Sequence, residues 1–167
     1  SLVRTMEGHS KGVTALELCS TRRNVADPEL VVSGSGDYTL KIWRHRTGEL
    51  VRTIKAHGDG VSALAIDGAV AVSGSFDSTA TAWNLSNGKA TTTFKSHFGA
   101  ISGVALKGTV AASASREGRI CVWDRITGKM TAQLDEEDSS YVTSLLMGRG
   151  VLFAGYFDGT MRVWNVD

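Results

Sequence analysis

Four tryptophan residues divide the 167-residue chain at almost equal intervals. Trp43, Trp83, Trp123 and Trp164 lie 40, 40 and 41 residues apart, and an acidic residue stands six positions before each of them. A fixed period of this length is the signature of a repeat architecture, in which each unit packs on its neighbours. We therefore expect one domain, residues 1–167, made of four repeats at approximately 2–49, 50–89, 90–129 and 130–167.

Each repeat is written as a series of short strands. "VTALELC", "LVVSGS", "TLKIWR" and "LVRTIK" carry apolar residues at alternate positions and are rich in β-branched residues. The segments "RTGE", "SNGK" and "ITGK" have the composition of tight hairpin turns. Four short strands in about 40 residues indicate an all-β propeller with four-stranded blades.

The His, Ser and Asp residues of the repeats admit a catalytic and a structural interpretation. In hydrolases an Asp orients a His, which activates a nucleophilic Ser. Alternatively, a buried Trp N–H needs an acceptor, and a chain from Trp through Ser and His to Asp satisfies several buried polar groups at once. Because an active site needs one copy and a network that locks each blade needs one per blade, the repetition favours the structural role.

The four repeats resemble the WD-repeat family of β-propellers over residues 2–167. The resemblance rests on pairs of segments such as "GHSKGVTAL" with "GSGDYTLKIW" and "AHGDGVSAL" with "GSFDSTATAW". It implies a structural tetrad of His, Ser, Asp and Trp in each blade. In the first three repeats the matching residues are His9, Ser33, Asp37 and Trp43; His57, Ser73, Asp77 and Trp83; and His97, Ser113, Glu117 and Trp123.

The fourth repeat departs from this pattern. It keeps Asp158 and Trp164, but Asp138 stands where the family has His and Ala154 where it has Ser. Trp164 then lacks its usual partner, so we expect the fourth blade to be the weakest.

The resemblance also bears on how the ring closes. In WD-repeat propellers the strand before "GH" belongs to the preceding blade, so "LVRT" at residues 2–5 is expected to complete the last blade and close the ring. Four blades are the lower limit for propellers. Three arrangements therefore stay open: a closed four-bladed ring, part of a larger ring with further blades, and an eight-bladed ring made by two copies of the chain.

Partner-binding residues are expected on the top-face loops, where the family resemblance singles out three positions per blade. The first blade has only small residues there, whereas the others offer Phe76, Arg116, Tyr141 and Phe157. Exposed aromatic residues and Arg carry much of the binding energy at protein interfaces. Such a patch suits a peptide with an apolar side chain and an acid, although inward packing of the aromatic rings is the structural alternative.

Composition and motifs narrow the function classes. A net charge of +1 gives no reason to expect nucleic acid or an anionic membrane as partner, and no apolar run is long enough to cross a bilayer. We find no metal-spaced His/Cys cluster, no phosphate-binding Gly loop and no cofactor motif, and the two cysteines form no pair. The expected function is a non-catalytic scaffold that binds other proteins in an intracellular complex, cytoplasmic or nuclear. A ubiquitin-ligase substrate receptor and, more remotely, a propeller enzyme are the alternatives.

Two irregular segments carry further hypotheses. The acidic run "DEED" at 135–138 leads into a top loop and is a candidate contact for a basic partner. The run "STRRNVADPE" at 20–29 lengthens the first repeat and is expected to be a loop on the bottom face.

Overall fold

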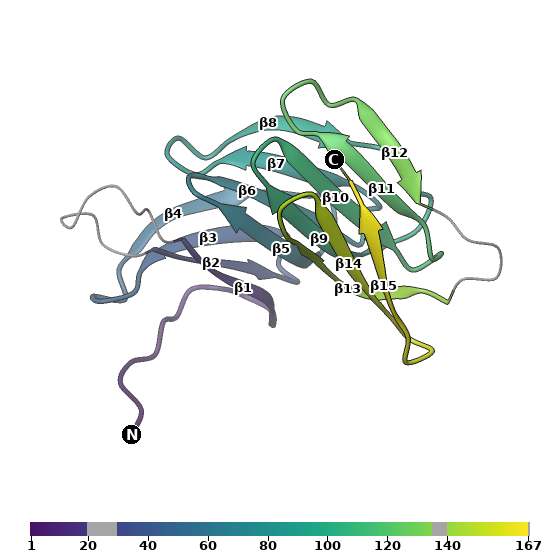
Figure 1. The fold of residues 1–167 in the computed structure, drawn as a ribbon. Helices are drawn as coiled ribbons and strands as arrows, with labels where there is room; N and C mark the ends of the chain where they lie inside the picture. The colour runs from purple at the N-terminus through teal and green to yellow at the C-terminus, as the bar shows by residue number, and fades with distance from the viewer. Residues whose placement is uncertain (20–29, 135–139, 167) are drawn as a thin grey trace.

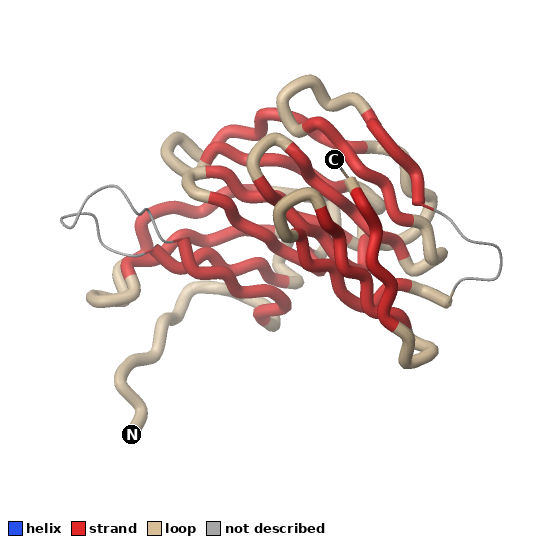
Figure 2. Tube along the Cα trace, viewed as in Figure 1, coloured by secondary structure: helices blue, strands red, loops and turns tan. Residues whose placement is uncertain are grey.

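The described part of the chain folds into fifteen strands arranged in four antiparallel sheets (Figure 1). The structure is a computed structural model that describes residues 1–19, 30–134 and 140–166, and all regular elements among these residues are strands (Figure 2). The acidic run at 135–138 and the segment 20–29 lie outside the described residues. The strands are β1 (Val13–Cys19), β2 (Leu30–Ser35), β3 (Thr39–Arg44), β4 (Leu50–Lys55), β5 (Val61–Asp67), β6 (Val70–Ser75), β7 (Ala80–Asn84), β8 (Lys89–Phe94), β9 (Ile101–Lys107), β10 (Val110–Ser115), β11 (Ile120–Asp124), β12 (Met130–Leu134), β13 (Val142–Met147), β14 (Val151–Tyr156) and β15 (Met161–Asn165).

Each sheet is one blade with its strands in chain order. The first three blades have four strands each, β1–β4, β5–β8 and β9–β12, and the fourth has three described strands, β13–β15. The hairpin between the third and fourth strands turns on a glycine with positive φ, for example Gly48 at 74°. A residue with a Cβ is strained in that conformation, which is why the turn segments of the sequence contain glycine there.

The first three blades pack on one another through a knob of one blade that fills a hole in the blade before it, whereas Ala114 takes the place of the hole glycine at the third junction. Val61, at the start of β5, points at Gly34 in β2, where an added Cβ would come within 2.6 Å of its Cγ1. Ile101, at the start of β9, packs in the same way on Gly74 in β6. Both knobs are fully buried. The alternation of large and absent side chains therefore lets adjacent sheets approach closely and form the core between blades.

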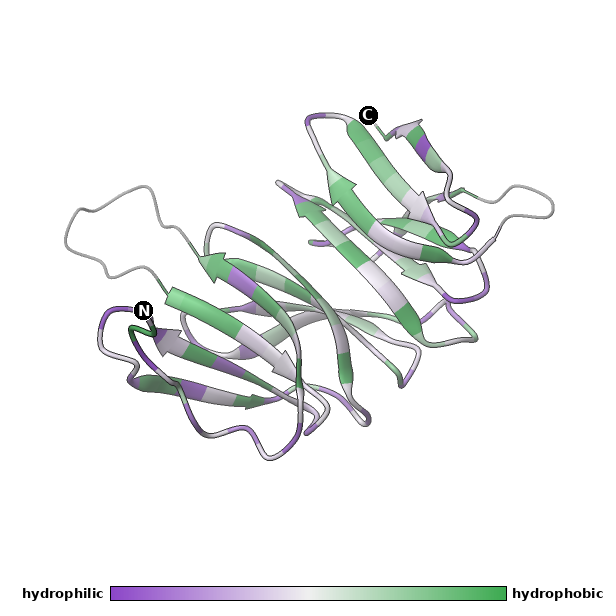
Figure 3. Ribbon diagram, turned by 90° about the horizontal axis from the view of Figure 1, so that it is seen from below, coloured by the Kyte–Doolittle hydropathy of each residue, from purple (hydrophilic) through white to green (hydrophobic). Residues whose placement is uncertain are grey.

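The cores between blades are apolar and the turns are polar. Figure 3 shows hydrophobic residues along the strands within the sheets and hydrophilic residues concentrated in the turns. Three clusters of buried side chains fill the successive blade junctions, and they include Ile54 and Leu64 in the first and Phe94 and Val104 in the second. The hydrophobic periodicity of the sequence is thus used to pack sheet on sheet.

The four blades form an open arc, so the expected closure by the chain's own N-terminus is wrong. Residues 2–5 form no strand, and Leu2 and Val3 are 85% and 90% exposed. The N-terminal segment leans on the first blade, where Arg4 Nη1 donates a hydrogen bond to the carbonyl of Thr47 at 2.6 Å. In Figures 1 and 3 it lies far from β15, at the opposite end of the arc. The physical reason is curvature: four blades do not turn far enough to bring the two ends together.

Candidate binding surface

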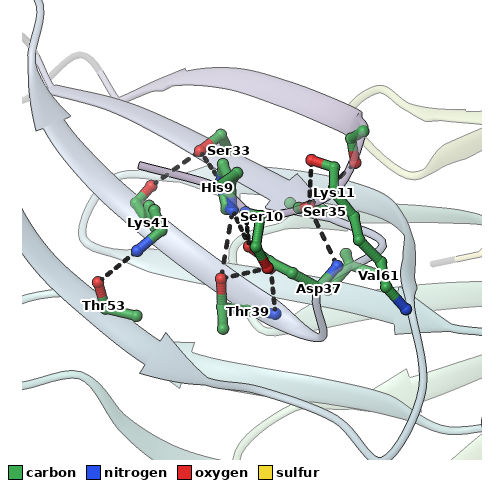
Figure 4. A network of polar contacts seen from close by, with 12 residues as sticks. His9, Ser10, Lys11, Ser33, Ser35, Asp37, Thr39, Lys41, Thr53 and Val61 are labelled. Carbon is green, nitrogen blue, oxygen red and sulfur yellow. Dashed lines mark hydrogen bonds and ion pairs between the residues drawn. The ribbon is translucent and has the colours of Figure 1, made fainter. Parts of the chain in front are cut away.

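A chain of polar contacts ties the first blade together (Figure 4). Trp43 Nε1 donates a hydrogen bond to Ser33 Oγ at 2.8 Å. His9 Nε2 lies 2.7 Å from the same oxygen, as Figure 4 shows. His9 Nδ1 lies 2.8 Å from Asp37 Oδ2. Asp37 also accepts hydrogen bonds from the Ser10 amide and the Thr39 hydroxyl. The network joins β2, β3 and the loop that enters β1.

The second and third blades repeat the central part of this network. In the second, Trp83 Nε1 and His57 Nε2 lie 2.8 and 2.7 Å from Ser73 Oγ. His57 Nδ1 lies 3.2 Å from Asp77 Oδ2. The corresponding distances from Ser113 Oγ in the third blade are 2.9 Å to Trp123 Nε1 and 2.7 Å to His97 Nε2.

Two blades depart from the full set of contacts. In the third, Glu117 replaces Asp and bends over the loop after His97, where a Cβ added at Gly99 would lie 3.0 Å from its Oε1. In the fourth, Ala154 offers no hydroxyl, and the buried Trp164 Nε1 has no hydrogen-bond partner among the described residues. Asp158 accepts hydrogen bonds from the amide and hydroxyl of Thr160 in its own turn. Asp138, which stands in the His position, lies outside the described residues.

Hydrogen bonds and burial shift the pKa values of three residues in the first two networks. Burial alone would raise the pKa of Asp37 and Asp77. Hydrogen bonds from Thr39, His9 and the Ser10 amide outweigh that effect at Asp37 and set its pKa well below the usual range. At Asp77 the bonds from Thr79 and the Gly58 amide likewise lower the pKa. Burial lowers the pKa of His57, against the opposing influence of Asp77.

This geometry places Asp, His and Ser in the order of a catalytic triad but in the wrong environment for one. Ser33, Ser73 and Ser113 are at most 3% exposed, and each accepts a tryptophan N–H. A nucleophile must reach its substrate, and these oxygens are sealed between strands. The contacts fit a role in holding the blades together.

The rim that carries these networks also carries the aromatic residues predicted to bind a partner. Phe76, in the β6–β7 turn, is 39% exposed, and the Arg116 guanidinium of the next blade lies 5.5 Å above its ring. This distance is within the range of a cation–π interaction. The curvature of the arc therefore joins two of the predicted residues into one pair across the junction between the second and third blades.

The other two predicted residues form a second pair. The rings of Tyr141 and Phe157 stack with their centroids 4.6 Å apart. Phe157 remains 67% exposed and Tyr141 37%. The two residues are joined by their backbones as well, since the Phe157 amide donates to the Tyr141 carbonyl. The outer surface of this pair is available to a partner.

Two more pairs of this kind were not found from the sequence. Lys11 Nζ lies 4.9 Å above the Tyr38 ring in the first blade, where only small rim residues were expected. In the third blade Arg119 lies 5.6 Å above the ring of Phe98, which is 82% exposed. The available signal was position, because Tyr38 directly follows the tetrad Asp37 and Phe98 directly follows the tetrad His97.

Comparison with known families settles the relationship of the chain. The model of the family described as "WD domain, G-beta repeat" matches residues 1–44, 48–84 and 88–124. The chain belongs to the WD-repeat family. The fourth repeat, which has lost the tetrad Ser and His, lies outside the matched ranges.

Individual relatives match this WD-repeat chain over short stretches. Nuclear distribution protein nudF of Aspergillus terreus is 38% identical over 68 residues, which cover 41% of this chain and 14% of that protein. Coatomer subunit beta'-2 of Arabidopsis thaliana is 32% identical over 60 residues, 36% of this chain and 6% of that protein. The chain thus spans a small part of the curated relatives it matches.

Solved structures match almost the entire WD-repeat chain. The computationally designed Ika4 protein superposes with a TM-score of 0.85 at 32% identity, covering 98% of this chain and 96% of that one. The computationally designed Ika8 protein gives 0.84 at 32% identity, covering 97% of this chain and 48% of that one. The match therefore covers nearly all of the Ika4 chain and about half of the Ika8 chain.

The described residues contain neither a helix long and apolar enough to cross a membrane nor a group of three or more potential metal ligands among His, Cys, Asp and Glu.

Proposed function

We propose that this WD-repeat chain is a non-catalytic scaffold that binds segments of other proteins on its top rim, within an intracellular complex of the cytoplasm or nucleus. The observation that carries the proposal is the pair of neighbouring aromatic sites at Phe76–Arg116 and Tyr141–Phe157. Phe76 directly precedes Asp77 of the second-blade network, whereas the Tyr141–Phe157 stack stands on the fourth blade, which lacks the tetrad Ser and His. Rigid loops on a stable β-scaffold are where binding residues concentrate.

The side chains of the two rim sites indicate which class of peptide would bind there. The Arg116 guanidinium is exposed and offers hydrogen-bond donors to a carboxylate, while it rests on the face of Phe76. The stacked pair of Tyr141 and Phe157 offers a flat apolar surface on the fourth blade. A peptide with an acidic residue and a large apolar residue a few positions apart is the ligand that these two sites fit.

A random peptide library displayed on phage tests the proposal, because the selection requires no named partner. We expect peptides selected on the wild-type chain to combine an acidic and an apolar residue. Arg116→Glu and Phe157→Ala should each weaken their binding at least about tenfold, the equivalent of about 1.4 kcal/mol. Ile126→Ala is the matched control, because Ile126 is 62% exposed in the turn at the opposite end of the strands.

Two results would contradict the scaffold proposal. One is that the library yields no peptide that binds the wild-type chain. The other is that the selected peptides bind Arg116→Glu and Phe157→Ala as tightly as wild type. Circular dichroism of both variants guards against loss of folding as the explanation.

No contact among the described residues favours the ubiquitin-ligase alternative. Asp124 and Arg125, the acidic and basic residues that follow Trp123, are engaged within the third blade. Asp124 accepts hydrogen bonds from the amides of Ile126 and Thr127, and Arg125 Nε donates to the carbonyl of Gly108. These contacts are those of a capped hairpin turn, and they leave the pair with a structural role.

A further inference from the structure

The first blade exposes an apolar stripe that the later blades bury wholly or in part. Val13, Leu16 and Leu18 of β1 are 51%, 64% and 53% exposed, and we call them the first-blade face. At the matching positions of the third blade, Ile101, Val104 and Leu106 are 0%, 6% and 7% exposed, because the second blade covers them. The first-blade face has the composition of a blade junction but lacks the blade that would cover it.

The fourth blade exposes the opposite half of the same junction. Its uncovered side, which we call the fourth-blade face, includes Leu146, Met161 and Val163 at 68%, 69% and 55% exposure. Phe153 and Gly155 of β14 complete it, and with Leu146 and Met161 they line one hollow. In the first blade the residues matching Met161 and Val163 are Leu40 and Ile42, which are 0% and 1% exposed beneath the next blade.

The two faces carry the knob and the hole that pack the first three blades on one another. Val13 matches the knobs Val61 and Ile101, and Gly155 matches the holes Gly34 and Gly74 into which those knobs fit. One knob is therefore left over at the start of the arc, and one hole is left over at its end.

The hydroxyl groups of Thr14 and Thr143 also occupy matching positions at the blade junctions. Thr14 Oγ1 lies 3.1 Å from the Gly34 carbonyl of its own blade and 2.6 Å from the Val61 carbonyl of the next blade. In the fourth blade, Thr143 Oγ1 makes the equivalent contact with the Gly155 carbonyl at 3.0 Å. A knob seated in the Gly155 hole would bring its own carbonyl to Thr143.

The N-terminal segment already occupies the place of an outer strand for a preceding blade. Residues 2–5 and 50–53 share the sequence LVRT, and the second copy lies in β4, the outer strand of the first blade. Arg52 Nη2 reaches from β4 to the carbonyl of Ser86 in the hairpin turn of the second blade, and Arg4 Nη1 reaches the carbonyl of Thr47 in the hairpin turn of the first.

The packing of these two arginines on the hairpin turns is also the same. A Cβ added at Gly88 would lie 2.6 Å from Arg52 Cδ, and one added at Gly48 would lie 2.6 Å from Arg4 Cδ. Residues 2–7 are thus held beside the first blade as β4 is held beside the second. What they lack is a third strand to pair with.

The fourth blade lacks the complementary element. β15 pairs with β14, and no fourth strand follows it among the described residues, whereas β4, β8 and β12 complete the other blades. An unpaired strand edge is a template for a strand of another chain. With the register of β3 and β4, in which Ile42 faces Arg52, Val163 of one copy would face Arg4 of the other.

We propose that two copies of this chain join head to tail into an eight-bladed ring, each first-blade face covering the other copy's fourth-blade face. Residues 2–7 of each copy then form the missing outer strand on β15 of the other. The count of blades limits the ring to two copies: eight lies within the range of propellers, whereas three copies would make twelve. The superposition on about half of the Ika8 chain agrees with an arc that continues for its own length.

The mass of the 167-residue chain in solution is the first test. We expect sedimentation equilibrium to give twice the chain mass of 17.7 kDa. Leu16→Glu and Val163→Glu should each shift the chain toward monomer, with the dissociation constant raised at least about tenfold, since each places an unpaired charge in both junctions. Both residues are solvent-exposed in the single arc, so its fold should persist, and Ile126→Glu should remain a dimer.

Mixing the two monomeric variants separates this ring from a symmetric face-to-face dimer. Leu16→Glu keeps an intact fourth-blade face and Val163→Glu an intact first-blade face, so an equimolar mixture forms one sound junction. We expect dimer to reappear in the mixture, with a larger dissociation constant than wild type. In a symmetric face-to-face dimer both copies use the same face, so the substitution in that face alone would prevent pairing. Mixing the two variants would then restore no junction.

Cross-linking checks the strand register. A chain with Arg4→Cys mixed with a chain with Val163→Cys should form a covalent dimer on oxidation, because directly opposed strand positions are close enough for a disulfide. Neither chain should do so alone, and Arg4→Cys mixed with Ile126→Cys is the control. A wild-type monomer at every concentration, a cross-link in Arg4→Cys alone, or no complementation on mixing would overturn the proposal and leave the two faces to further blades or another protein.

Discussion

Removal of one hydroxyl from the second blade tests whether the tetrads hold the propeller together. Ser73 is fully buried, and its Oγ is within hydrogen-bond distance of both Trp83 Nε1 and His57 Nε2. Ser73→Ala removes the oxygen, changes the volume little and leaves both nitrogens without that partner. A buried polar group left unsatisfied costs about 1–3 kcal/mol. For two such groups we expect the free energy of unfolding to fall by about 2–6 kcal/mol, which is a large share of the stability of a domain.

The assay is urea unfolding followed by tryptophan fluorescence at one fixed protein concentration. The concentration must be held constant because association of the folded chain would add to its apparent stability. Ser86→Ala is the matched control, since Ser86 is exposed in the β7–β8 turn and such substitutions usually change stability by less than about 0.5 kcal/mol. If Ser73→Ala unfolds within about 0.5 kcal/mol of wild type, the second-blade network contributes no net stability and the structural interpretation of the tetrads is refuted.

Three further substitutions and conditions follow from the same contacts. Ala154→Ser should stabilise the chain by about 1 kcal/mol, seen as a thermal midpoint about 2–4 °C higher, because it gives the buried indole N–H of the fourth blade an acceptor. Gly74→Ala should destabilise it by about 1–3 kcal/mol in urea unfolding, since the new Cβ would lie 2.3 Å from Ile101 Cγ2, whereas Gly12→Ala meets no atom within 4 Å and should be neutral. The free energy of unfolding should fall as pH drops below the ordinary histidine pKa of 6.5, because His57 has a lowered pKa in the folded chain and takes up a proton more readily when unfolded. His57→Gln lacks this titrating group. The urea midpoints of wild type and His57→Gln, measured between about pH 8 and pH 5, should therefore converge toward low pH.

The blades could be predicted because each is specified locally. The spacing of Trp43, Trp83 and Trp123 marks the repeat, and the alternation of apolar residues between the glycine turns marks the strands. Strand partners lie next to each other in the chain, so period and turn chemistry suffice to pair them. The same holds for the tetrad contacts, which join residues of one repeat.

Ring closure could not be predicted because it depends on geometry between blades. Leu2–Thr5 and Leu50–Thr53 have the same four residues, yet only the second segment is part of a strand. The difference is that the second segment has β3 beside it, whereas β15 lies at the far end of the arc from the first. β-Structure requires a partner edge, and a sequence match does not supply one.

The rim pairs show the same division between local and non-local information. Phe76 and Arg116 were expected on the rim as members of one patch, and the packing of two neighbouring blades decides that one lies over the other. Tyr141 and Phe157 belong to one repeat, and their rings stack beside a hydrogen bond between their backbones. The Lys11–Tyr38 pair lies at positions that the family pattern does not single out, so only the folded arrangement reveals it.

The fourth blade combines an incomplete set of structural contacts with one of the proposed binding sites. It lacks the Ser and His of the tetrad and a described outer strand, and its Leu146 and Met161 are uncovered. Local stability is lowest where backbone edges and apolar contacts are left unpartnered. The Tyr141–Phe157 stack stands on this blade, so its rigidity depends on whatever completes the sheet. Ring closure and partner binding at the rim are therefore expected to be coupled: an occupant of the fourth-blade face orders the blade, and an ordered blade presents the stacked rings with less loss of entropy on binding.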